Sequence, residues 1–150
     1  MRSLPAAFRI GRLCLLLASL QAPVAFAAPA YLQGNNITTY ASAASTDGKL
    51  QLYVYCNRLG KLDTYVEVAV KPDSYLSVAQ QFDKGPKEEV SYIPEMNGSI
   101  MFLAQNKRSA FIEQVKKSSK LTMTLETQTY TVPLDALNRT LKGFVCKLGG

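Results

Sequence analysis

The residue types that usually perform acid–base or nucleophilic chemistry are sparse in this chain of 150 residues, which contains no histidine. Without an imidazole, neither a Ser-His-Asp triad nor a histidine-based metal site can form. Glycoside hydrolysis needs two facing carboxylates. The candidates by residue type are Glu67, Asp83, Glu88 and Glu89. Because acidic residues on turns and strand faces are usually solvated, we predict no catalytic residues, and a small carboxylate hydrolase remains the least favoured hypothesis.

A serine–lysine pair is the other nucleophilic arrangement that the residue types allow. Ser109 lies near Lys107 and Lys116 in the sequence, but no local signature supports such a pair. We interpret Ser109 as a helix N-cap instead. The chain also lacks a glycine-rich phosphate loop. The sequence therefore predicts no cofactor and a protein that is not an enzyme.

The first 27 residues have the three parts of a secretory signal peptide. Three arginines form a positive region, an apolar stretch follows at 13–20, and residues 25–28 read Ala-Phe-Ala-Ala. We expect cleavage after Ala27, with export to the periplasm and secretion beyond it as an alternative end point. A retained membrane anchor is the competing interpretation, but the apolar stretch is shorter than the ~20 residues that a bilayer requires.

Cleavage would leave Cys56 and Cys146 as the two cysteines, since Cys14 lies in the signal. An even pair in an oxidising compartment predicts one disulfide. The competing interpretation is a pair of metal ligands, but two thiolates supply only half of a zinc site. We therefore expect no metal.

The charge balance gives little support to a nucleic-acid partner. The whole chain carries 17 basic and 11 acidic residues, and the signal holds three of the basic ones, which leaves a mature net charge of +3. Nucleic-acid binding would favour a dense basic stripe. The one cluster, Lys116 and Lys117 with Lys120, is interpreted as a solvated helix end. No second segment is apolar enough to span a membrane, so we expect a protein partner and no stable membrane insertion.

Alternation of apolar and polar residues predicts a β-rich domain over residues 50–148. Residues 28–49 are predicted to be a flexible N-terminal lead-in with at most one short strand. Helical periodicity covers 107–118, and Asp135 is the expected N-cap of a second, short helix. Local, hairpin-linked strands favour a mostly antiparallel sheet. The expected fold class is α+β, a single sandwich or barrel-like domain with two short helices and one disulfide.

Tyrosine is the one overused residue type, and several tyrosines fall in or beside the predicted strands. If they shared a solvent-facing side, they would form an amphipathic binding face. The residues proposed for this face are Tyr53, Tyr55, Tyr65 and Tyr92. The alternative is ordinary strand propensity with cross-strand packing.

Four segments in a fixed order resemble the small bacterial periplasmic proteins of the VasI kind, which are associated with type VI secretion. The segments are a strand ending in Cys-Asn at 50–57, Phe-Asp-Lys-Gly-Pro at 82–86, a helix from Phe111 that runs into 119–123, and Val-Pro-Leu-Asp-Ala-Leu at 132–137 before Cys146. The resemblance covers about residues 50–147. The chain departs from the family in two places: Tyr92 stands nearest to the place of a tryptophan, and a glycine after the Asp-Ala-Leu stretch is missing.

The resemblance implies no enzymatic activity and transfers no site residues. It favours a non-enzymatic binding or accessory protein of an envelope or type VI secretion-type system that acts through protein–protein contacts. The alternative is an immunity or inhibitor protein that blocks a periplasmic hydrolase, such as a lysozyme-like enzyme or a toxin. In that case the loop at residues 83–98 is the candidate for the segment that enters the active site.

Overall fold

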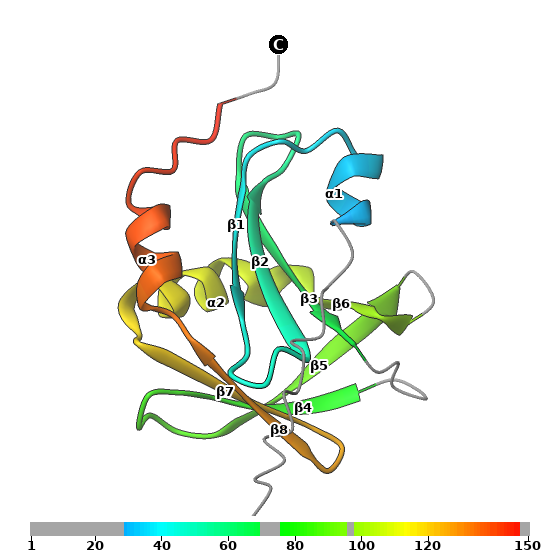
Figure 1. The fold of residues 1–150 in the computed structure, drawn as a ribbon, viewed down its shortest axis with the longest axis vertical. Helices are drawn as coiled ribbons and strands as arrows, with labels where there is room; N and C mark the ends of the chain where they lie inside the picture. The colour runs from blue at the N-terminus through cyan, green and yellow to red at the C-terminus, as the bar shows by residue number, and fades with distance from the viewer. Residues whose placement is uncertain (1–28, 70–75, 96–97, 148–150) are drawn as a thin grey trace, which may run out of the picture.

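Eight antiparallel strands form one sheet in the computed structural model, which describes residues 29–69, 76–95 and 98–147 (Figure 1). The predicted signal peptide lies outside the described residues. The sheet order is β1-β2-β3-β6-β5-β4-β7-β8. The strands are β1 (Tyr40–Ala44), β2 (Leu50–Cys56), β3 (Leu62–Val68), β4 (Leu76–Phe82), β5 (Glu88–Glu95), β6 (Ile100–Leu103), β7 (Lys120–Leu125) and β8 (Gln128–Pro133), and the helices are α1 (Ala30–Gly34), α2 (Gln105–Lys117) and α3 (Asp135–Leu141).

The two outermost strands of the sheet approach each other. Beside the end of β1, the backbone N–H of Thr46 donates to the carbonyl oxygen of Thr131 on β8 at 2.8 Å. This contact joins the two ends of the strand order, so the curved sheet is a nearly closed barrel. The predicted class is therefore confirmed: a mostly antiparallel α+β single domain that is barrel-like.

The N-terminal segment differs from the prediction, because the described part of residues 28–49 belongs to the fold. β1 pairs with β2 along its whole length, and Ala41 is buried in the core. The turn that follows is closed by Ser45, whose hydroxyl donates to Asp47 at 2.6 Å and accepts from the N–H of Leu50 at 3.0 Å. The segment is therefore not a flexible lead-in, and α1 adds a helix to the two expected.

Alternation along the strands produces two hydrophobic clusters on opposite faces of the sheet. On the inner face, side chains from all eight strands pack with Phe111 and Val115 of α2, with two leucines of α3 and with Leu134 just before it. On the outer face, Leu32 of α1 covers the smaller cluster. Figure 1 shows α1 on one side of β2 and α3 on the other. The helices therefore complete both faces of the sheet.

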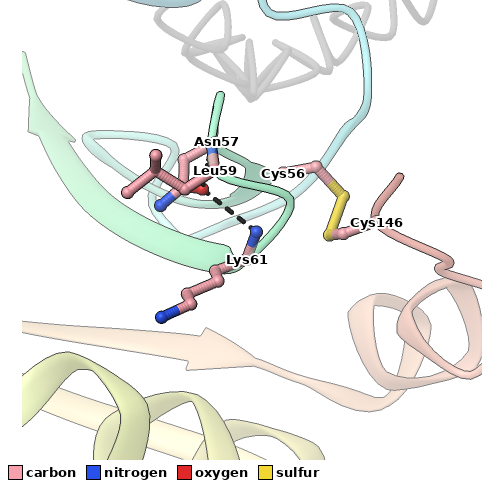
Figure 2. Close-up of a disulfide and its surroundings, with 5 residues drawn as sticks. All are labelled: Cys56, Asn57, Leu59, Lys61 and Cys146. Carbon is pink, nitrogen blue, oxygen red and sulfur yellow. Dashed lines mark hydrogen bonds between the residues drawn. A yellow bond between two sulfur atoms is a disulfide. The ribbon is translucent and has the colours of Figure 1, made fainter. Parts of the chain in front are cut away.

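The β2–β3 hairpin carries the first half of the disulfide. In its turn the Asn57 side-chain oxygen accepts from the backbone N–H groups of Leu59 and Lys61, both at 3.0 Å (Figure 2). Gly60 supplies a φ of 69° that other residues rarely adopt. Cys56, immediately before the turn, is bonded to Cys146 with an S–S distance of 2.03 Å. The predicted disulfide is confirmed, and it attaches the C-terminal segment to the end of this hairpin.

The helix boundaries correct two predicted caps. Ser109 lies inside α2 rather than at its N-cap, because the helix begins at Gln105, directly after β6. Asp135 is the first residue of α3, and Leu134 occupies the cap position without a side-chain hydrogen bond. Asp135 can still stabilise α3, since a negative charge in the first turn complements the helix dipole.

Candidate functional site: a groove between α2 and the β4–β5 hairpin

The tyrosines predicted to form an exposed binding face are buried. Tyr53, Tyr55 and Tyr65 share the outer face of β2 and β3 but expose only 4%, 2% and 1% of their surface. Tyr31 of α1 lies across them, with its ring centroid 5.2 Å from that of Tyr65. Because α1 covers the three tyrosines, the interpretation as cross-strand packing is correct for them. The prediction of a solvent-exposed binding face is wrong for this conformation.

Tyr92, the fourth predicted member, lies apart from the other three. It is 1% exposed and belongs to the inner cluster, where its hydroxyl donates to the side-chain oxygen of Gln80 at 3.4 Å. Burial raises the pKa of the Tyr92 hydroxyl above its ordinary value. The structure therefore separates the predicted set into two environments and leaves neither open to solvent.

A hollow on the described surface lies between α2 and the hairpin of β4 and β5. It is a groove of about 570 Å³ with an apolar floor. The ring of Phe82 at the end of β4 meets that of Phe111 on α2 edge-to-face, with centroids 5.4 Å apart. Val90 and Leu103 extend the floor along β5 and β6. Apolar floors with polar rims are typical of ligand and peptide sites.

Polar residues from two elements form the rim of this groove. α2 contributes Lys107, Gln114 and Lys117, and β5 contributes Glu88. Gln80, also in the lining, is only 6% exposed, and its side-chain oxygen accepts from Tyr92. The groove therefore combines an apolar base with separate cationic and anionic positions on opposite walls.

Asp83, at the end of the groove, has a structural function. Its backbone has a φ of 49°, and its carboxylate accepts from the N–H groups of Ser119 and Lys120, both at 3.0 Å. These bonds fix the end of the β4–β5 hairpin to the start of β7. Within the turn, the Gln81 side-chain amide donates to the carbonyl of Gly85 at 2.8 Å. The hairpin wall of the groove is therefore held in place from both sides.

The four carboxylates considered for hydrolysis do not gather at one centre. Of the four, only Asp83 and Glu88 line the groove, and the carboxylate of Asp83 accepts hydrogen bonds from the backbone of Ser119 and Lys120. Glu89 accepts a hydrogen bond from the Ser77 hydroxyl at 2.8 Å. Glu67 lies on β3 near Tyr53, and burial raises the pKa of its carboxyl while the Tyr53 hydrogen bond opposes this effect.

Sequence reasoning did not identify the groove, although it placed Phe82 and Phe111 in separate elements. The two residues meet because β4 pairs with β7 as well as β5, and this order is not local in the sequence. The one signal for the site was the Phe-Asp-Lys-Gly-Pro turn at 82–86, whose residues form the hairpin wall. This sequence segment predicted a turn, but it did not predict that α2 would lie opposite the turn.

Comparison of the chain with protein-family models, curated proteins and solved structures finds no match. Within the described residues, no three His, Cys, Asp or Glu side chains are arranged to hold a metal ion. None of the described helices is long and apolar enough to cross a membrane.

Proposed function

We propose that this protein is a non-enzymatic binding protein of the bacterial cell envelope, and that it holds a protein partner in the groove between α2 and the β4–β5 hairpin. The observation that carries the proposal is the groove itself. Its apolar floor includes Phe82, Val90 and Phe111, and its hairpin wall is fixed by Asp83. A preformed apolar groove with charged walls favours docking of another chain at low ordering cost.

The proposed compartment is the periplasm. The signal-like first 27 residues support it, and so does the disulfide between Cys56 and Cys146, because such bonds persist in oxidising compartments. The order of segments that resembles VasI-like proteins supports an accessory function in a type VI secretion-type system. Under this proposal the buried tyrosines are structural, and the groove replaces them as the binding surface.

The test is affinity capture from an envelope extract of the organism that encodes the protein. The bait is the chain from residue 28, compared with its Ala110→Trp and Ala136→Trp variants. Ala110 is exposed on α2 and lines the groove, whereas Ala136 is exposed on α3 and does not line it. Both alanines lie in helices, so the two tryptophans impose a similar local cost. We expect a specific partner with wild type and Ala136→Trp and its loss with Ala110→Trp.

Two results would count against the proposal. Retention of the same partner by Ala110→Trp would place binding elsewhere on the molecule. Recovery of nothing above background by any of the three baits would contradict stable partner binding as the main function. Circular dichroism of each bait establishes that the variants are folded before the comparison is made.

Inhibition of a periplasmic hydrolase is the second candidate function, and the hairpin turn favours it. All seven residues from Asp83 to Glu89 are exposed, and the turn is nevertheless fixed by hydrogen bonds at Asp83 and Gly85. A rigid exposed loop is the form in which many inhibitors enter an active site. If capture recovers a hydrolase, replacement of Lys84 by alanine at the tip should weaken inhibition, while Ala110→Trp should not.

A further inference from the structure

We propose that the groove receives its partner as an extended strand, which pairs with the free backbone edge of β5 at residues 88–91. This inference rests on the proposed function and specifies the form of the partner. Strand addition of this kind uses backbone hydrogen bonds for affinity and side-chain pockets for selectivity. Four residues of edge correspond to about 13 Å of extended chain.

The free edge arises because β5 is longer than its neighbour β6. β5 has eight residues, and β6 pairs only with its second half, from Tyr92↔Leu103 to Glu95↔Ile100. The chain leaves β6 at Leu103 to begin α2. On the opposite side, residues 88–92 of β5 pair with β4. Among the described residues, the side of 88–91 that faces away from β4 therefore has no strand partner.

The surroundings of this edge suit an extended chain. A shallow hollow of about 540 Å³ runs along residues 88–91 and is bounded by the end of β6 and the first turns of α2. It shares Glu88, Val90, Leu103 and Lys107 with the larger groove. A strand paired here would direct alternate side chains toward the apolar floor, and the others outward toward Glu89.

Charge selects the occupant. Pairing of two copies through this edge would bring Glu88 and Glu89 of both chains together, and like charges close to one another across strands are destabilising. Because Glu88 and Val90 lie on the groove side of β5 and Glu89 on the other, a strand with apolar residues on one side and basic residues on the other would meet Val90 and Glu88 inside and Glu89 outside. The occupant is therefore an extended segment of another protein that alternates apolar with basic residues.

The probe is a synthetic peptide, acetyl-Val-Lys-Val-Lys-Val-Thr-amide, titrated into the disulfide-bonded protein. Amide resonances followed by NMR should shift chiefly at residues 88–91. The backbone amide protons of this segment that point away from β4 should exchange with solvent at about one tenth of their rate in the free protein, or more slowly. Glu89→Lys should weaken binding, whereas Glu126→Lys, an exposed charge reversal in the β7–β8 turn, should leave it unchanged.

Backbone methylation of the peptide makes the test specific for strand pairing. Only alternate N–H groups of an added strand point at its partner. Methylation of one alternate set should therefore weaken binding by about tenfold or more, and methylation of the other set should have little effect. Equal tolerance of both sets would overturn strand addition while leaving groove binding intact.

Two further outcomes would also overturn the inference. Binding of no peptide, with the partner still captured by wild type and lost by Ala110→Trp, would mean that the partner uses a folded surface. Concentration-dependent protection of residues 88–91 without any peptide would assign the edge to a second copy. The proposed function has its own separate test: it fails if the Ala110→Trp variant captures the same partner as wild type.

Discussion

At the scale of single residues, Arg108 connects three elements. Its guanidinium contacts both carboxylate oxygens of Asp63 at 3.1 Å and donates to the carbonyl of Leu103 at 2.7 Å. It also lies over the ring of Phe102, 5.1 Å from the centroid. The two charged side chains are 22% and 16% exposed, so the pair is partly shielded from water. Arg108 therefore fixes the start of α2, one wall of the groove, to β3 and β6.

Replacement of Arg108 by alanine should lower the free energy of unfolding by about 1–3 kcal/mol, because it removes charge-assisted hydrogen bonds at a partly buried site. Lys116→Ala is the matched control, since Lys116 makes an exposed pair with Glu113 on the same helix. Urea unfolding of both variants provides the measurement. Similar destabilisation by both variants would contradict the assigned function of Arg108.

Glu67 should make stability depend on pH. Its pKa in the folded protein is raised, first by burial, so folding favours the protonated form. One of its carboxylate oxygens is buried without a hydrogen-bond partner. A raised folded-state pKa means that stability is greatest below the unfolded pKa and declines as pH rises through the folded value.

Glu67→Gln should therefore raise the free energy of unfolding at pH 7, and the difference from wild type should shrink toward pH 4. Urea unfolding across this pH range measures it. Glu95→Gln removes the same charge from an exposed position of β5 and controls for net charge. A difference that is constant with pH would contradict this account of Glu67.

At the scale of elements, α1 is the cover of the outer face. It is only five residues long, too short to be stable alone, and its buried residue is Leu32. Tyr31 adds edge contacts to Tyr55 and Phe102. The helix therefore depends on the tyrosine cluster beneath it, and the cluster depends on the helix for its exclusion from water.

Leu32→Ala should lower the free energy of unfolding by about 2–5 kcal/mol, because Leu32 is fully buried. Cleavage by protease near α1 should accelerate in parallel. Leu59→Ala is the matched control, since Leu59 is 71% exposed in the β2–β3 turn and should change neither quantity. If Leu32→Ala matched this control, α1 would not be docked in solution.

Local pattern explains which elements were predictable. Ile100 and Phe102 alternate with Met101 and Leu103, and the structure places the two pairs on opposite faces, as strand alternation requires. α1 has no periodic pattern, since its stability comes from tertiary contacts of Leu32. The groove was not predictable, because it depends on pairing between strands distant in sequence. The alternation of residues along a strand therefore predicts which side chains share a face of the sheet, but it does not predict which element packs on that face.

At the scale of the whole molecule, the disulfide closes the largest loop. Cys56 and Cys146 are separated by 90 residues, so the bond restricts most of the unfolded chain and ties the segment after α3 to the β2–β3 hairpin. Together with the β1–β8 contact at Thr46, it joins the beginning and the end of the domain.

Replacement of both cysteines by serine should lower the free energy of unfolding by about 4.6 kcal/mol in the chain-entropy treatment. Denaturant unfolding of the double variant beside the oxidised wild type measures the change. The reduced wild type should match the double variant. A reduced protein as stable as the oxidised one would contradict a stabilising function for this bond.

The central claim, that a partner occupies the groove between α2 and the β4–β5 hairpin, is tested most directly by site-specific photo-crosslinking in living cells. The photoreactive residue p-benzoylphenylalanine replaces Ala110 in the groove or, as a control, Ala136 on α3. The account predicts one discrete higher-mass adduct from position 110 and none from position 136. Equal adducts from both positions, or an adduct from position 136 alone, would contradict it.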